Sequence, residues 1–256
     1  MLDWMESKDA LLITGARQVG KSYLVREFLK DKFDHFVEIN LYDHKEWIPV
    51  LEQAKNADDL LFRITAFSKE SLEEGSTLVF FDEIQYAQDW DRWLKIIYDM
   101  QPDTNVVATG SASPALIKGN QESGAGRWTV IQVPTMSFYE YCELLDLDRP
   151  QLPKTLKMTQ MLYMTQPERT RIMMQLQKVQ NHFTRYLQVG GFPELALSDN
   201  DIMAQQIMRE DVVDKVLKRD LPSLYNLRNA TELERIFLYL CNVSSEIVSI
   251  EAIAKE

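Results

Sequence analysis

The stretch Gly15-Ala16-Arg17-Gln18-Val19-Gly20-Lys21-Ser22 decides the fold class of this chain. It fits the pattern G-x-x-x-x-G-K-[ST] without a gap. The apolar run from Ala10 to Thr14 precedes it and predicts a buried strand, and apolar residues at helical spacing follow it between Lys21 and Asp31. A glycine-rich loop between a strand and a helix is the setting in which backbone N–H groups surround phosphate oxygens. We therefore expect a phosphate-binding loop from Gly15 to Ser22.

Each residue type in this loop suits nucleotide chemistry. Gly15 and Gly20 allow the backbone to wrap closely around phosphate, and the helix that begins near Gly20 adds the positive end of its dipole. We expect Lys21 to reach the β- and γ-phosphates and the Ser22 hydroxyl to ligate Mg²⁺. The motif thus predicts ATP and Mg²⁺ as cofactors. The alternative is a strand-to-helix turn that binds nothing.

Segments of strand and helix character alternate through the first part of the chain. Continuous apolar runs predict further strands at 36–41, 77–81, 105–109 and 128–133. Helical patterns lie between them at 56–70 and 89–100, and another follows at 137–145. Because apolar strands that alternate with helices form parallel sheets covered on both faces, we predict an α/β P-loop NTPase domain at residues 1–148.

The remaining residues, 149–256, are expected to form a mostly helical C-terminal region. The segment 148–157 carries Pro150 and Pro153 and is typical of a linker. Helical patterns follow at 166–188, 201–218 and 231–242, and the turn Gly190-Gly191-Phe192-Pro193 separates the first two.

Two acids follow the apolar strand at 77–81. Ligands gather at the carboxyl ends of strands in a parallel sheet, so Asp82 is expected beside the phosphate loop, where it can hold Mg²⁺. Glu83 could orient a water for attack on the γ-phosphate, which favours hydrolysis over transfer to another substrate. The alternative is that both acids only cap the next turn.

Two further site candidates lie in polar or glycine-rich segments. Ser111 or Thr109, at the end of the 105–109 strand, could sense the γ-phosphate or hold the attacking water. Arg127 follows the segment Ser123-Gly124-Ala125-Gly126, and a mobile arginine can stabilise charge on the transferring phosphate, in cis or from a neighbouring subunit. The alternatives are a small-residue turn and a structural arginine.

Composition excludes several other classes of protein. The formal net charge of −11 gives no overall attraction to nucleic acid or to an anionic membrane. The cysteines Cys142 and Cys241 form no CxxC pair, so neither a zinc site nor a disulfide framework is indicated. The first residues do not resemble a signal peptide, and no apolar run is long enough for a membrane span, so we expect a cytoplasmic protein without a membrane partner.

In combination, these motifs resemble an AAA+-type P-loop ATPase. The similarity is to a prokaryotic family of predicted ATPases with a C-terminal domain of unassigned function, and it covers nearly the whole chain. The matching stretches are Gly15 to Ser22, Phe81-Asp82-Glu83-Ile84-Gln85, Thr109-Gly110-Ser111, Ser123 to Arg127, Ser137-Phe138-Tyr139-Glu140, Tyr186 to Glu194 and Lys218-Arg219-Asp220.

The resemblance implies a sheet order and a longer C-terminal region. The 105–109 strand is expected between the loop strand and the strand that ends at Asp82. Family members continue through a winged-helix unit into a further domain. Here 231–242 looks like the first helix of that unit and 250–256 like the start of the second, so we expect a fragment or truncated product without the recognition helix and wing. DNA binding, an option for the intact family, is then doubtful for this chain, and a homo-oligomer or protein partner is left open.

The predicted function is Mg²⁺-dependent hydrolysis of ATP to ADP and phosphate, coupled to an unidentified conformational or partner-binding output. The alternative is an ATP-gated switch or interaction protein with little hydrolysis of its own. A small-molecule kinase lacks support, because no acceptor lid is evident and Glu83 suits water. A basic DNA-binding face lacks support too, because the segment 209–220 mixes lysine and arginine with aspartate and glutamate.

Overall fold

The computed structural model describes residue 4 and residues 9–69, 75–87, 90–100, 104–111, 128–149, 152, 157–222, 227, 229–244 and 246–253. The chain divides into two compact units, Met1–Ser137 and Phe138–Glu256. We expected the domain boundary at residue 148. The helix α7 (Phe138–Leu144) lies before that residue but belongs to the second of these units. Among the described residues, no helix combines the length and the apolar character that crossing a membrane requires.

A five-stranded, wholly parallel sheet organises the first unit. The strand order is β2-β3-β4-β1-β5, so β4 lies between the strand before the phosphate loop and the strand that ends at Asp82. This is the order that the family resemblance implies, and the predicted α/β fold is confirmed. The strands are β1 (Ala10–Gly15), β2 (His35–Asn40), β3 (Thr77–Asp82), β4 (Thr104–Ser111) and β5 (Trp128–Val133).

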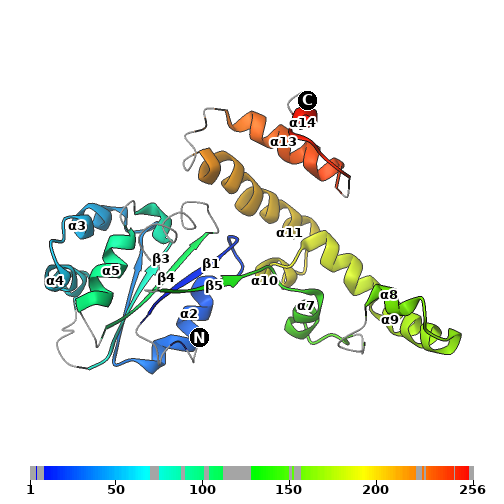
Figure 1. Cartoon of the computed structure of the whole chain (residues 1–256), viewed down its shortest axis with the longest axis horizontal. Coiled ribbons are helices and arrows are strands. Elements are labelled where there is room, and N and C mark those ends of the chain that lie inside the picture. Colours follow the sequence, from blue (N-terminus) through cyan, green and yellow to red (C-terminus); the bar gives the residue numbers. More distant parts are fainter. Residues whose placement is uncertain are drawn as a thin grey trace. The chain divides into compact units, whose positions relative to one another are not determined.

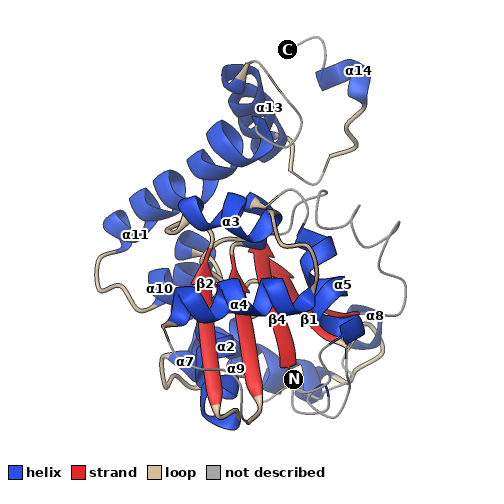
Figure 2. Ribbon diagram, turned by 90° about the vertical axis from the view of Figure 1, so that its left-hand side faces the viewer, coloured by secondary structure: helices blue, strands red, loops and turns tan. Residues whose placement is uncertain are grey.

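Apolar residues on both faces of the sheet explain why the strands read as continuous hydrophobic runs. Along β3, Val79 and Phe81 join the core cluster that also contains Leu60 and Trp93. Leu78 and Phe80 of the same strand face the opposite side and join a second cluster around Val25 of the helix α2 (Lys21–Leu29). Helices therefore cover both faces, with α3 (Ile48–Glu52), α4 (Ala57–Ser68) and α5 (Trp90–Met100) on one and α2 on the other (Figures 1 and 2).

Three helices of the first unit lie within one or two residues of the predicted segments 21–31, 56–70 and 89–100, whereas the short helix at Ile48–Glu52 was not predicted. In α4 the Asn56 side chain accepts a hydrogen bond from the backbone N–H of Asp59, and Lys69 ends the helix in the left-handed conformation. The helices are α2 (Lys21–Leu29), α3 (Ile48–Glu52), α4 (Ala57–Ser68) and α5 (Trp90–Met100), and short 3₁₀ turns lie at η1 (Lys30–Lys32), η2 (Lys45–Trp47) and η3 (Ile84–Tyr86).

The second unit is mostly helical, as predicted. The long helix α9 begins with a capping box between Thr165 and Glu168 and ends at Gly190, which has a φ of 75°. Helix α9 spans Gln166–Val189. The other described helices of the second unit are α7, α8 (Met158–Met161), α10 (Pro193–Ala196), α11 (Asp201–Ile207), α13 (Ala230–Asn242) and α14 (Ile250–Ile253). The predicted helix at 201–218 continues beyond α11 in the wider π-helical form, as η4 (Met208–Asp214) and η5 (Val216–Asp220).

Candidate nucleotide-binding site

Backbone geometry forces the course of the phosphate loop between β1 and α2. Gly15 has a φ of 154°, and a Cβ atom there would lie 2.2 Å from the carbonyl oxygen of Val133 on β5. Gly20 has a φ of 91° and Gln18 a φ of 58°, both in the left-handed region. The loop therefore turns through conformations that glycine adopts readily and other residues seldom do. Its end is tied to α2, because the Leu24 N–H donates to the Gly20 carbonyl over 2.9 Å.

The Lys21 side chain turns back into this loop. It is only 6% exposed, and its ammonium nitrogen donates to the carbonyl oxygens of Ala16 at 2.7 Å and Gly15 at 3.2 Å. Burial lowers the pKa of Lys21, while the nearby charges of Glu83 and Asp82 oppose that shift. The loop thus holds a desolvated cation next to two carboxylates, an arrangement that suits an anionic ligand carrying its own metal ion.

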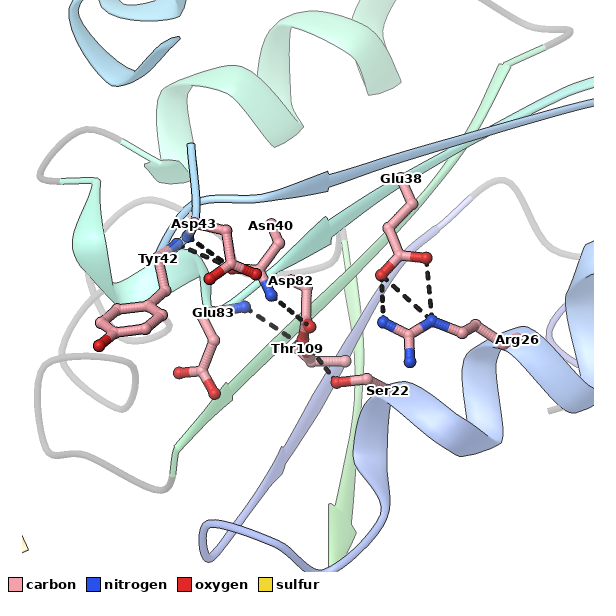
Figure 3. Close-up of polar contacts among 9 residues, drawn as sticks. All are labelled: Ser22, Arg26, Glu38, Asn40, Tyr42, Asp43, Asp82, Glu83 and Thr109. Atoms are coloured by element: carbon pink, nitrogen blue, oxygen red, sulfur yellow. Dashed lines mark hydrogen bonds and ion pairs between the residues drawn. The ribbon is translucent and has the colours of Figure 1, made fainter. Parts of the chain in front are cut away.

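Asp82 is the last residue of β3, and its carboxylate contacts the end of the phosphate loop (Figure 3). The Ser22 hydroxyl lies 2.7 Å from its Oδ1 atom, and the Asn40 amide nitrogen lies 3.2 Å from its Oδ2 atom. The Thr109 hydroxyl also donates to Oδ1. A serine hydroxyl beside a buried carboxylate is a pair of hard oxygen ligands, which is the chemistry that Mg²⁺ prefers. The residues predicted to hold the metal therefore fit it.

Glu83 follows β3 directly and has a strained backbone, with a φ of 57°. Its N–H group lies 3.4 Å from the Thr109 hydroxyl oxygen, and its carboxylate accepts a hydrogen bond from the Gln85 side chain. Figure 3 shows its side chain beside the group formed by Asp82, Ser22 and Thr109 and separate from it. Asp82 therefore lies within the polar cluster, and the Glu83 side chain lies beside it.

The two polar candidates on β4 differ in their surroundings. Thr109 is fully buried and bonded to Asp82, as described above. Ser111 pairs with Gly15 in the sheet register, and its buried hydroxyl has no hydrogen-bond partner among the described residues. A buried hydroxyl without a partner costs free energy unless a ligand or water satisfies it. The Ser111 hydroxyl is therefore available to donate a hydrogen bond to a phosphate oxygen. The other candidate, Arg127, lies outside the described residues.

Sequence reasoning missed two residues of this site, Asn40 and Gln85. Asn40 ends β2 directly opposite Asp82 in the sheet register, and its side-chain oxygen Oδ1 accepts hydrogen bonds from the backbone N–H groups of Tyr42 and Asp43. The rule that placed Asp82, that strand ends share one edge, would have found Asn40 too. Gln85 ends the stretch Phe81 to Gln85 that matches the family, but we predicted no role for it, because it lies in a short turn whose course the sequence did not predict.

Two family models match the chain. The model of the AAA domain family matches residues 7–142, and that of a domain of unknown function matches residues 180–256. The chain is similar to the uncharacterized protein MJ1544 of Methanocaldococcus jannaschii, at 26% identity over 95% of this chain and 48% of that protein. It is also similar to MJ1637 of the same organism, at 22% identity over 97% of this chain and 52% of that protein. The chain thus spans about half the length of these relatives.

Among solved structures, the Walker-type ATPase PABY2304 of Pyrococcus abyssi is similar at 18% identity, with a TM-score of 0.44, over 99% of this chain and 85% of that one. The AAA domain model itself covers more than half of the present chain. The chain therefore belongs to the AAA domain family, as a P-loop AAA+-type ATPase domain joined to a C-terminal domain of unknown function.

Proposed function

We propose that this protein binds ATP with Mg²⁺ and hydrolyses it to ADP and phosphate. The observation that carries the proposal is the 2.7 Å contact between the Ser22 hydroxyl and Asp82, which brings the phosphate loop and the acidic strand end together. A carboxylate next to the loop hydroxyl provides a metal site, and Glu83 beside it provides a base. These three residues supply what water attack on a γ-phosphate requires.

In this proposal the loop from Gly15 to Ser22 binds the phosphates and Lys21 neutralises the β- and γ-phosphate oxygens. Ser22 and Asp82 hold Mg²⁺, which when bound offsets the charge on those oxygens. Glu83 accepts a proton from water as the new bond from water oxygen to γ-phosphorus forms. The bond from γ-phosphorus to the bridging oxygen breaks, and ADP leaves with that electron pair. Ser111 contacts the γ-phosphate, and Arg127 stabilises its charge in cis or in trans.

The output of hydrolysis is proposed to lie in the second unit or in a partner. The sequence matched to a domain of unknown function makes up much of that unit. A second copy of the chain or another protein is the partner that we propose, and the −11 net charge argues against a broad nucleic-acid surface.

Two substitutions test this proposal by separating binding from chemistry. Glu83→Gln keeps the shape of the side chain but removes the base, so turnover should fall by about 10²–10⁴-fold while nucleotide affinity is retained. Asp82→Asn should weaken Mg²⁺-dependent binding and turnover together. Phosphate release and the affinity for a fluorescent ATP analogue would be measured for both. Glu27→Gln, at an exposed acid on α2, is the matched control and should behave as the parent.

Two results would contradict the assignments. If Glu83→Gln hydrolyses ATP at the parent rate, the base lies elsewhere. If the parent binds ATP and releases no phosphate, the protein is the ATP-gated switch instead.

A further inference from the structure

The short turn after Glu83 places a second side chain against the Glu83 carboxylate. This turn, η3, is held by backbone hydrogen bonds from Tyr86 to Glu83 over 3.2 Å and from Ala87 to Ile84 over 3.0 Å. Ile84 is fully buried and Ala87 is 2% exposed, so both anchor the turn in the sheet core. Gln85 lies between them, and its position relative to Glu83 is therefore set by the core.

The amide of Gln85 can meet the carboxylate in only one useful orientation. Its nitrogen, Nε2, donates to Oε2 of Glu83. With the amide turned over, its carbonyl oxygen would face the carboxylate oxygen, and neither atom can donate. In the observed orientation Oε1 of Gln85 is buried and has no partner within the described part of the chain. The amide thus restrains the carboxylate at one end and leaves an acceptor at the other.

We propose that Gln85 is a positioning residue that orients the Glu83 carboxylate for attack of water on the γ-phosphate. This inference rests on the proposed hydrolysis. The Thr109 hydroxyl accepts a hydrogen bond from the backbone N–H of Glu83, and the Gln85 amide donates one to the Glu83 carboxylate. A carboxylate restrained at both places spends little time in unproductive rotamers, and orientation of this kind contributes to rate.

Two variants remove the donor in different ways. Gln85→Met keeps the length of the side chain but neither donates nor accepts strongly, and Gln85→Glu keeps an acceptor but places a like charge next to Glu83. Both should lower kcat by roughly tenfold to a hundredfold, the scale of one hydrogen bond to a charged group. For Gln85→Met the KM for ATP and the affinity for an ATP analogue should stay at parent values, which also shows that this variant is folded. Gln53→Met, at an exposed glutamine after α3, is the control and should leave both parameters unchanged.

The decisive measurement is a double-mutant cycle with Glu83→Gln, using single-turnover phosphate release. If Gln85 acts through the carboxylate, Gln85→Met should cost nothing further in the Glu83→Gln background. The role of Gln85 would be overturned by an equal loss in both backgrounds, by a change in KM alone or by an unchanged kcat. As long as the parent hydrolyses ATP, these results leave the hydrolase proposal standing. A parent that releases no phosphate would overturn both proposals.

Discussion

At the scale of the residue, Lys21 carries a charge in a place that disfavours charge. Burial lowers its pKa, and the side chain is held by the carbonyl oxygens of Gly15 and Ala16. The carboxylates of Asp82 and Glu83 oppose the effect of burial and favour the protonated form. A desolvated cation of this kind interacts with phosphate more strongly than an exposed lysine does.

The first prediction follows from that desolvation. Lys21→Ala should weaken binding of an ATP analogue by about 30- to 1,000-fold, the scale of one lost charge-assisted contact at a buried site. Fluorescence titration would measure the dissociation constant, with Lys30→Ala, an exposed lysine just after α2, as the matched control. Equal affinity in Lys21→Ala and the parent would show that the loop does not bind the phosphates.

At the scale of the element, the paired strands β2 and β3 carry polar contacts at both ends, and only those at the carboxyl end belong to the candidate site. At the carboxyl end, Asn40 and Asp82 pair across the strands within the candidate site. At the amino end, the Asp34 carboxylate accepts hydrogen bonds from the backbone N–H of Ser76 at 2.8 Å and from its hydroxyl at 2.9 Å. These bonds lie at the edge of the sheet away from the site, so their contribution should be to stability and not to activity.

A pH-dependent stability is the second prediction. The Ser76 hydrogen bonds hold the pKa of Asp34 below its ordinary value of 3.8. A carboxyl with a lowered folded-state pKa stabilises the fold above its unfolded pKa, and that contribution disappears as the pH falls through the folded pKa. Asp34→Asn should therefore lower the free energy of unfolding at neutral pH and match the parent at acid pH.

Urea denaturation at several pH values between about 7 and 2 would follow this difference, since the window lies at and below the unfolded aspartate pKa. Asp31→Asn, at an exposed acid in η1, is the control. A gap between Asp34→Asn and the parent that stays constant down to the lowest pH would show that the ionised carboxylate is not the stabilising form.

At the scale of the whole molecule, Arg185 of α9 joins several elements of the second unit. Its guanidinium donates to Asp201 at 2.9 Å, to the Tyr141 hydroxyl at 2.7 Å and to the carbonyl oxygens of Ala196 at 3.0 Å and Ser198 at 2.6 Å. One side chain thus connects α9 to α7, to α10 and the turn after it, and to α11. The planar, multiply donating guanidinium suits such a junction, and a lysine could not replace it.

The corresponding prediction is that damage to this junction stays within the second unit. Arg185→Met should destabilise that unit by roughly 2–4 kcal/mol, since it leaves a buried tyrosine hydroxyl and backbone acceptors without their donor. Hydrogen exchange should accelerate in α9 to α11, while binding of an ATP analogue by the first unit is unchanged. Arg171→Met, at an exposed position of α9, is the control. If nucleotide binding were lost when the helices α9 to α11 lose protection from hydrogen exchange, the two units would not fold independently.

Much of the architecture could be predicted because its signals are local. The strands at Ala10 and Thr77 are continuous apolar runs, and the structure buries both on two faces. The helix predicted at 201–218 is present, but it continues beyond Ile207 in the π-helical form, which the sequence did not predict. The roles of Lys21, Ser22, Asp82, Glu83, Ser111 and Arg127 remain predictions.

By itself, the sequence determined the phosphate loop and the alternating α/β domain, since glycine conformations, apolar runs and a helix start are properties of neighbouring residues. Only the tertiary structure decided which side chains surround Asp82. Ser22, Asn40 and Thr109 reach it from 60, 42 and 27 positions away. These distances are closed by the strand order, with β4 between β1 and β3, and by the pairing of β2 with β3. The order depends on how both faces of the sheet are buried together, which no single segment specifies.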